Sequence, residues 1–287
     1  MRLLLIANPT AGNHAPQRIE TVRRALQQHG AEVEVYLTRA AGDAEQHATT
    51  MRSGPFTRIV AAGGDGTLNE VINGLAGSDM PLAFIPLGTT NVFALESGIP
   101  FDLQQAAAIA CQAAPRAVTL GIAGQRYFLL MAGVGFDGQV VASVSSRLKH
   151  ILGKGAYLVA ALQQLLFFPP RLFKAHTGGE QLQAAGLLLA NARCYGGKFT
   201  LTPAADLTSP DLEACLLTRS GRLTLLRQGL ALVLSRTLPP GIGELRTLTE
   251  VQIETPGLPV QIDGDYLGVT PMTFGCAAES LQLVYPA

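Results

Sequence analysis

The residues whose types and spacing most clearly suggest a functional site are the three glycines and one acid at positions 63–66, Gly-Gly-Asp-Gly. An apolar run at 59–62 precedes them and predicts a buried strand, and apolar residues at helical spacing follow from Leu68 to Leu75. A strand, a glycine turn and a helix N-terminus make an anion site, because amide N–H groups and the positive end of the helix dipole converge there. The run therefore predicts a nucleotide-phosphate site, with a plain strand-to-helix turn as the alternative.

Asp65 places a carboxylate inside this turn, which otherwise favours anions. A carboxylate beside a phosphate makes sense when a metal ion or a substrate hydroxyl lies between them. Thr67 and Glu70 have the spacing of a capping box, which predicts the start of the helix. The Walker pattern with its lysine occurs nowhere in the chain, which argues against a P-loop NTPase.

Two acidic turns in the second half of the chain are further candidates. The loop 206–213 has oxygen-bearing side chains at alternating positions, so it is either a Mg²⁺ loop or an ordinary solvated turn. Asp263 and Asp265 flank Gly264 after a predicted strand, where Asp-Gly is also a frequent hairpin signal. The residues alone leave both interpretations open for each turn.

The elements that must position the first site alternate between strand and helix over residues 1–120. This alternation predicts an α/β domain with a parallel sheet and helices on both faces. Strands are expected at 2–7, 33–37, 59–62 and 81–86, with helices after the first three and a further helix at 103–113. Small polar residues follow the four strands, and ligands bind at the carboxyl ends of such strands. We therefore expect Asn8, Thr38, residues 63–69 and residues 88–91 to converge.

Strand signals dominate from about residue 120 onward. A hairpin is expected at 118–122 and 127–132, further strands at 187–191, 212–217, 251–254, 260–262 and 281–284, and helices at 140–148, 151–168 and 223–234. This pattern predicts a β-sandwich-like domain with helices packed on its side. The expected domains are 1–119 and 120–287, with the last strand able to return to the first domain.

The segment 133–138 matches G-x-G-x-x-G but is interpreted as a tight turn into a helix. It follows strands that look antiparallel, and no Asp or Glu stands about twenty residues downstream, as a dinucleotide-binding fingerprint requires.

Composition narrows the classes of function. The charged fraction is 15% and the formal net charge is zero, so nucleic acid is a poor candidate partner. The mean hydropathy of +0.27 hints at an apolar cleft or a lipid partner. The four cysteines have no metal or redox spacing, which is typical of a reduced, cytoplasmic protein. No apolar run reaches the length of a transmembrane segment.

Several short motifs occur in a fixed order along the chain. They are Asn8-Pro9, Gly63-Gly-Asp-Gly-Thr67, Pro86-Leu-Gly-Thr89 with Asn91, Gly133-Val-Gly-Phe-Asp137, Gly196-Gly197 with Pro203, and Asp263-Gly-Asp265. The ordered set resembles the bacterial lipid kinases of the diacylglycerol kinase catalytic-domain superfamily, which includes sphingosine and ceramide kinases. The resemblance covers nearly the whole chain, and its glycine–aspartate core is shared with NAD kinases.

The resemblance implies a nucleotide-binding α/β domain, a β-sandwich domain, an active site in the cleft between them, and the cofactors ATP and Mg²⁺. The residues expected at ATP are Asn8, Thr38, Gly63, Gly64, Asp65, Gly66, Thr67, Leu68, Asn69, Gly88, Thr89 and Asn91. Asp265 is the expected base, assisted by Asp263 and Asp65, and a structural Mg²⁺ would take Asp206, Ser209 and the Asp211 carbonyl. Ser209-Pro210 stands where relatives usually have Asp-Gly, and Asp265 where they typically have Glu.

The predicted activity is therefore an ATP:lipid phosphotransferase of phospholipid biosynthesis, acting on a lipid such as diacylglycerol at the membrane surface. The expected location is the cytoplasm, with transient membrane contact through residues 151–168 and nearby Arg147, Lys149 and Lys154. A core helix is the alternative for that segment, and a homodimer is one possible state. The alternatives in function are an NAD kinase-like enzyme and a catalytically weak nucleotide- and lipid-binding protein.

Overall fold

The computed structural model describes residues 1–144, 155–168, 171–237 and 243–286. The chain divides into two compact units, which we call unit 1 (Met1–Leu120 with Ala278–Ala287) and unit 2 (Gly121–Ala277). The expected boundary, between residues 119 and 120, lies one residue from this division. The closing strand, β18 (Met272–Val284), contributes residues to both units.

Unit 1 is built on a parallel sheet. Its strands are β1 (Arg2–Ala7), β2 (Glu32–Leu37), β3 (Arg58–Gly63) and β4 (Leu82–Pro86), in the order β2-β1-β3-β4. The end of β18 adds to this sheet, because Leu283 and Val284 pair parallel with β4. Strands β1, β3 and β4 are apolar along almost their whole length because both faces of the sheet are covered.

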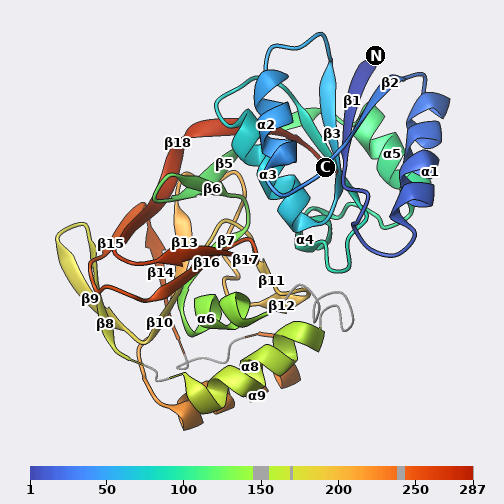
Figure 1. Ribbon diagram of the computed structural model, residues 1–287. Helices are drawn as coiled ribbons and strands as arrows, with labels where there is room; N and C mark the ends of the chain where they lie inside the picture. Colours follow the sequence, from blue (N-terminus) through green and yellow to red (C-terminus); the bar gives the residue numbers. More distant parts are fainter. Residues whose placement is uncertain (145–154, 169–170, 238–242, 287) are drawn as a thin grey trace. The chain divides into compact units, whose positions relative to one another are not determined.

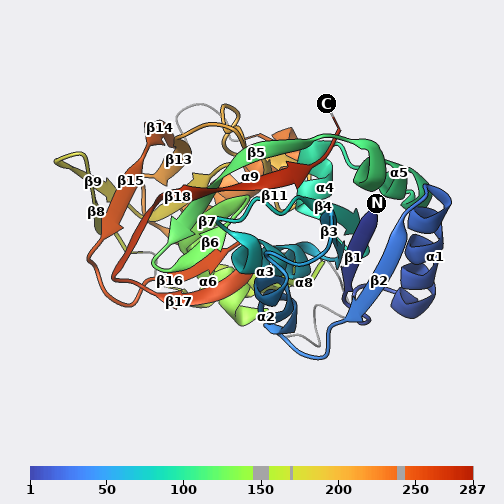
Figure 2. The same ribbon diagram turned by 90° about the horizontal axis from the view of Figure 1, so that it is seen from above.

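Helices cover the two faces of this sheet (Figures 1 and 2). Helix α1 (Ala15–Gln28) packs with α5 (Leu103–Gln112), and α2 (Asp43–Thr50) packs with α3 (Asp65–Leu75). A short helix that the sequence analysis did not predict, α4 (Val92–Ser97), follows β4. The predicted α/β class of the first half is confirmed.

Unit 2 is a sandwich of mostly antiparallel strands. One sheet has the order β14 (Glu244–Leu248), β13 (Leu212–Leu217), β10 (Gly186–Ala190), β7 (Met131–Gly135), β16 (Pro259–Ile262), β17 (Asp265–Val269). The other layer has the order β18 (its first part), β15 (Glu250–Ile253), β8 (Phe173–Thr177), β9 (Glu180–Ala184). Side chains of both layers, including Phe128, Phe173 and Phe274, form one buried core. The predicted β-sandwich-like class is confirmed.

The remaining elements of the second half complete the sandwich. They are β5 (Pro115–Ala123), β6 (Arg126–Phe128), β11 (Cys194–Tyr195), β12 (Phe199–Thr200), α6 (Phe136–Ser143), α8 (Gly155–Phe167) and α9 (Arg222–Ser235). Helices α8 and α9 pack on each other (Figure 1). In the part of the chain that the structure describes, no helix is both long and apolar enough to cross a bilayer.

Three local predictions are wrong. Helix α3 begins at Asp65, so Thr67 lies inside it, and Glu70 accepts the Ala44 N–H at 3.2 Å instead of closing a capping box. The helix expected at 140–148 begins at Phe136, because Gly135, at φ 91°, turns the chain directly out of β7; residues 145–148 lie outside the described residues. The strand expected at 127–132 is split between Phe128 and Met131.

The expected strands at 187–191, 212–217, 251–254 and 260–262 correspond to β10, β13, β15 and β16, and the expected strand at 281–284 is only the end of the longer β18. Strands β8, β9, β14 and β17 were not expected. Two of them, β9 and β14, alternate polar exposed residues with few apolar ones, so little in their sequence marks a strand.

Candidate active site

The loops at the carboxyl ends of the parallel strands meet in unit 1, as the sequence predicts. Parallel strands end at the same edge of a sheet, and three backbone hydrogen bonds link the loops at that edge. The Thr38 N–H donates to Ala7 O at 2.9 Å, the Asn8 N–H to Ala62 O at 3.0 Å, and the Gly88 N–H to Gly63 O at 3.0 Å. The convergence of the four predicted segments is confirmed.

Glycines allow these loops to approach one another closely. A Cβ added at Gly88 would lie 2.7 Å from the Cα of Gly64, and one added at Gly12 would collide with the Leu87 carbonyl. Arg18 donates to that carbonyl at 2.7 Å and to Pro86 O at 3.1 Å, a clamp that nothing in the sequence pattern indicates. Gly64 differs from the others, because the nearest atom to an added Cβ would be 3.8 Å away.

The N-terminus of α3 lies within this cluster of loops, which we call the cradle. The Leu68 N–H donates to Gly64 O at 3.1 Å in the first turn of the helix, and amides earlier in a helix have no acceptor within it. Such amides, with the helix dipole, suit a phosphate. Leu68 and Asn69 are buried, and the Asn69 Oδ1 accepts from Asn73 Nδ2 at 3.0 Å. The backbone donors that suit a phosphate therefore lie before Leu68. Of the residues predicted to bind ATP, Leu68 and Asn69 are thus not among these donors.

The Asp65 carboxylate holds helix α4. Its Oδ2 accepts the Val92 N–H at 2.9 Å, and its Oδ1 accepts the Phe93 N–H at 3.2 Å. Both bonds satisfy amides at the start of α4, which otherwise lack acceptors. Asp65 thus fixes one glycine turn to the other, and this interaction explains why an acid stands among the glycines.

The other predicted side chains make few contacts outside this loop cluster. Asn8 Nδ2 donates to Thr67 Oγ1 at 3.3 Å. Asn91, at φ 49° and 1% exposed, donates from Nδ2 to Gly88 O at 2.7 Å, and its buried Oδ1 has no hydrogen-bond partner among the described residues. Thr89 is exposed. A nucleotide phosphate at this edge would therefore meet mainly backbone groups.

The turn 263–265 in unit 2 separates its two acids. Asp263, at φ 49°, accepts the N–H groups of Leu129, Leu130 and Met131 at 2.8, 2.8 and 3.0 Å. These three bonds also explain the split of the expected strand at 127–132, because they turn the chain between β6 and β7. Asp265 begins β17 and is exposed. Of the two acids, Asp265 is the more exposed.

The loop expected to hold a structural metal contains several hydrogen bonds of its own. The Asp206 Oδ1 accepts from the backbone and the hydroxyl of Thr208 at 2.7 and 2.6 Å, and these bonds lower the pKa of Asp206. The Ser209 Oγ accepts the Asp211 N–H at 3.1 Å. Among the described residues, no three His, Cys, Asp or Glu side chains gather as metal ligands. The structural Mg²⁺ that the resemblance implied at these residues stays a prediction, because its expected ligands also include a hydroxyl and a backbone carbonyl.

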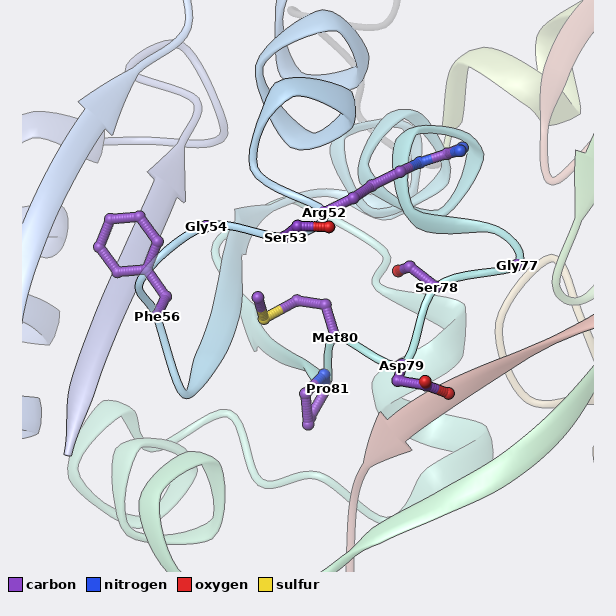
Figure 3. A pocket seen from close by; sticks show the side chains of 9 residues that line it. All are labelled: Arg52, Ser53, Gly54, Phe56, Gly77, Ser78, Asp79, Met80 and Pro81. Carbon is purple, nitrogen blue, oxygen red and sulfur yellow. The ribbon is translucent and has the colours of Figure 1, made fainter.

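A depression in unit 1 lies away from these residues (Figure 3). It is lined by Arg52, Ser53, Gly54, Phe56, Gly77, Ser78, Asp79, Met80 and Pro81. These residues precede β3 and β4, so they stand at the opposite edge of the sheet from the glycine turns. This depression is not part of the candidate site.

Comparison with known proteins identifies both halves of the chain. The model of the diacylglycerol kinase catalytic domain matches residues 2–123, and that of the YegS C-terminal NAD kinase beta sandwich-like domain matches residues 131–285. A Pseudomonas putida protein named "Probable lipid kinase YegS-like" is 34% identical, over 93% of this chain and 91% of its own. A Bacillus subtilis protein named "Diacylglycerol kinase" is 29% identical, over 99% and 96%.

A solved structure supports the same fold. The crystal structure of a diacylglycerol kinase from Bacillus anthracis has a TM-score of 0.74 and 20% sequence identity, and the match covers 99% of this chain and 97% of that one. Together, the two matching domain models, the relatives and the fold show that the chain belongs to the family of lipid kinases that join a diacylglycerol kinase catalytic domain to a YegS-type C-terminal domain.

Proposed function

We propose that the protein is an ATP-dependent lipid kinase, which transfers the γ-phosphate of ATP to a lipid hydroxyl such as that of diacylglycerol. The observation that carries the proposal is the meeting of the glycine turns of β3 and β4 at the N-terminus of α3, in a chain of this family. Membership supplies the reaction class, and the cradle supplies a place for phosphates.

The nucleotide phosphates would bind to the amides before Leu68 and in the space next to Gly64. Phosphoryl transfer depends on positioning and charge neutralisation more than on covalent chemistry by the protein. A Mg²⁺ ion that arrives with ATP would neutralise charge on the phosphates. Asp65 would act mainly by holding α4 and the Gly88 turn in place, since both of its oxygens accept backbone amides.

Asp265 would accept the proton of the lipid hydroxyl, directly or through one water. It is exposed at the start of β17, whereas Asp263 is engaged with three backbone amides. The proposal requires that nucleotide and base meet in the reacting complex. Asp265 is one methylene shorter than the Glu typical of the family, which makes a bridging water a reasonable partner.

The test is an incubation of purified protein with radiolabelled ATP, Mg²⁺ and a total lipid extract, followed by identification of the labelled product. We expect a labelled phospholipid, and a product yield at least about a hundredfold lower from the Asp265→Asn variant in the same time. Labelled NAD phosphate in a parallel incubation with NAD would instead favour the NAD kinase-like alternative. Nucleotide binding without any labelled lipid would favour a catalytically weak binding protein and contradict the proposal.

We further propose that helices α8 and α9 of unit 2 bring the protein to its lipid substrate at the membrane surface. Leu166 and Phe167 on α8 are 63% and 76% exposed, and Leu230 and Leu234 on α9 are 56% and 76% exposed. Exposed apolar side chains on neighbouring helices suit the boundary between lipid headgroups and acyl chains. Arg147, Lys149 and Lys154, the expected basic partners, lie outside the described residues.

Vesicle flotation tests this second step. The double variant Leu166→Glu and Phe167→Glu should remain folded and lose most of its binding to vesicles of mixed neutral and anionic lipids. Leu245→Glu, on the exposed strand β14, is the control for adding a charge to an apolar surface position of the same unit. Equal flotation of the double variant and the control would contradict membrane contact through α8.

A further inference from the structure

The motif at 133–138 has no role in the proposed nucleotide site, yet its glycines are closely packed. A Cβ at Gly133 would collide with the carboxylate of Asp137 and would lie 2.8 Å from the Gln261 Nε2. A Cβ at Gly138 would collide with the Pro259 carbonyl, where α6 packs on β16. The motif therefore makes room for an acid and an amide between α6 and β16.

Asp137 is the centre of a hydrogen-bonded network. Its Oδ1 accepts the hydroxyl of Tyr195 on β11, and its Oδ2 accepts the Nε2–H of Gln261 at 2.7 Å. Burial raises the pKa of the Asp137 carboxyl, while the two donors lower it. Gln261 is 2% exposed, so its amide is removed from water. A buried amide with both ends paired has a fixed orientation.

The other end of the Gln261 amide holds the acidic turn. Its Oε1 accepts the Gly264 N–H at 2.8 Å, between Asp263 and Asp265. The orientation of the Gln261 side-chain amide is therefore fixed. Its nitrogen donates to Asp137, and its oxygen accepts from Gly264. Asp263 anchors the turn to the chain between β6 and β7, and Gln261 anchors it to β16.

We propose that Asp137, Tyr195 and Gln261 form a positioning network that fixes the backbone of the turn carrying Asp265. The inference rests on the proposed function, in which Asp265 is the base. A base must lie within hydrogen-bond reach of its proton, so a small rotation of the turn lowers the rate of transfer. The network acts through Gly264 and contacts neither substrate nor nucleotide.

The fixed direction of the network gives a charge-swap test. In Gln261→Glu, two carboxylates face each other, and they share a proton only until the pH rises above the raised pKa of the pair. The double variant Asp137→Asn with Gln261→Glu restores each bond, with the direction of the bond between positions 137 and 261 reversed. The amide introduced at position 137 can donate to the carboxylate introduced at position 261, which can still accept the Gly264 N–H. The ionisable neighbours on adjoining elements, Tyr195, Asp263 and Asp265, are unchanged.

We expect Gln261→Glu to add a new alkaline limb to the pH profile of kcat, with a loss of about tenfold near pH 8. The Kd for ATP should change by less than about twofold, because the nucleotide site is in the other unit. The double variant should lose the new limb and recover to within about threefold of the parent. Gln183→Glu on β9, which is exposed, adds the same charge without touching the network and is the control.

Hydrogen exchange of the Gly264 amide provides a readout that does not depend on turnover. Faster exchange in Gln261→Glu, reversed in the double variant, would show that the network holds the turn even if no lipid is phosphorylated by the parent. Faster exchange with an unchanged kcat would overturn the positioning role. A double variant that folds and stays as impaired as Gln261→Glu would overturn the Asp137–Gln261 link.

Discussion

Unit 1 and unit 2 each contain a glycine turn with an acid, and the two turns use their acids differently. The oxygens of Asp65 accept two amides of α4, and those of Asp263 accept the amides of Leu129, Leu130 and Met131, which lead from β6 into β7. Unit 2 has a second acid on its turn, Asp265, which is exposed. The comparison separates two acids that are bound to backbone amides from an acid that is exposed to solvent.

The comparison also indicates what each unit would bring to the proposed phosphoryl transfer. The turn of unit 1 offers amides and the space beside Gly64, which suit an anion. The turn of unit 2 offers a carboxylate, which suits proton removal from a hydroxyl. Substitutions in the two turns should therefore affect binding, catalysis and stability to different degrees.

The largest expected effect comes from the exposed acid. Asp265→Asn should lower kcat by on the order of 10²–10⁴-fold and leave ATP affinity nearly intact, because only general-base chemistry is removed. Asp265→Glu should keep activity or increase it, since the longer side chain reaches farther. Steady-state kinetics with a lipid hydroxyl substrate, beside calorimetry with ATP, check this. An active Asp265→Asn together with a folded but inactive Asp263→Asn would reverse the assignment.

The next effect is on nucleotide binding. Gly64→Val should weaken ATP binding by at least about a hundredfold, because the side chain would occupy the space proposed for phosphate. The fold should survive, since φ at Gly64 is −95° and an added Cβ would have no neighbour closer than 3.8 Å among the described residues. Calorimetric titration and a thermal melt of the same sample measure both. Affinity within about threefold of the parent would exclude this position as the phosphate contact.

The third expected effect is on the free energy of unfolding, when either of the two acids that bind backbone amides is removed. Asp263→Ala leaves three amides without their acceptor and should lower the free energy of unfolding by roughly 2–4 kcal/mol. Asp65→Ala removes the amide acceptor of a short helix and should cost about 1 kcal/mol. Urea denaturation of both variants tests the order. A larger loss from Asp65→Ala would mean that its turn, and not the turn at 263–265, depends more on its acid.

The smallest effect is a difference in pH dependence between the units. Hydrogen bonds from Arg39 and Tyr36 lower the pKa of Asp43 to about 2, so this acid stabilises the fold above its unfolded pKa and loses that effect as the pH falls toward 2. Burial raises the pKa of Asp137, so its ionisation disfavours folding as the pH rises through the folded-state pKa.

Stability measured against pH for Asp43→Asn and Asp137→Asn should therefore differ from the parent with opposite slopes. The advantage of the parent over Asp43→Asn should grow as the pH rises from about 2 to 4, and its advantage over Asp137→Asn should shrink as the pH rises. Parallel curves for the two variants would contradict the contrast between a cation-paired acid and a buried one.

The sequence predicts the fold class and the convergence of the strand ends. The spacing of apolar residues and the glycine turns are local signals, which can be recognised without knowing the tertiary contacts. It does not predict α4, whose start depends on Asp65 far away in the chain, or the split at residues 129–130, which depends on Asp263. Arg18 and Gln261 carry no motif, since their roles arise from tertiary contacts. The base, the bound metal and the homodimer stay predictions.

The strand shared by the two units has a consequence for synthesis on the ribosome. Unit 1 is interrupted after Leu120 and is completed only by Ala278–Ala287. Until Leu283 and Val284 emerge and pair with β4, one edge of its sheet lacks this partner, and such an edge can pair with other chains. The nascent chain is therefore expected to need protection until Leu283 and Val284 have left the ribosome, and variants that lack these two residues should aggregate.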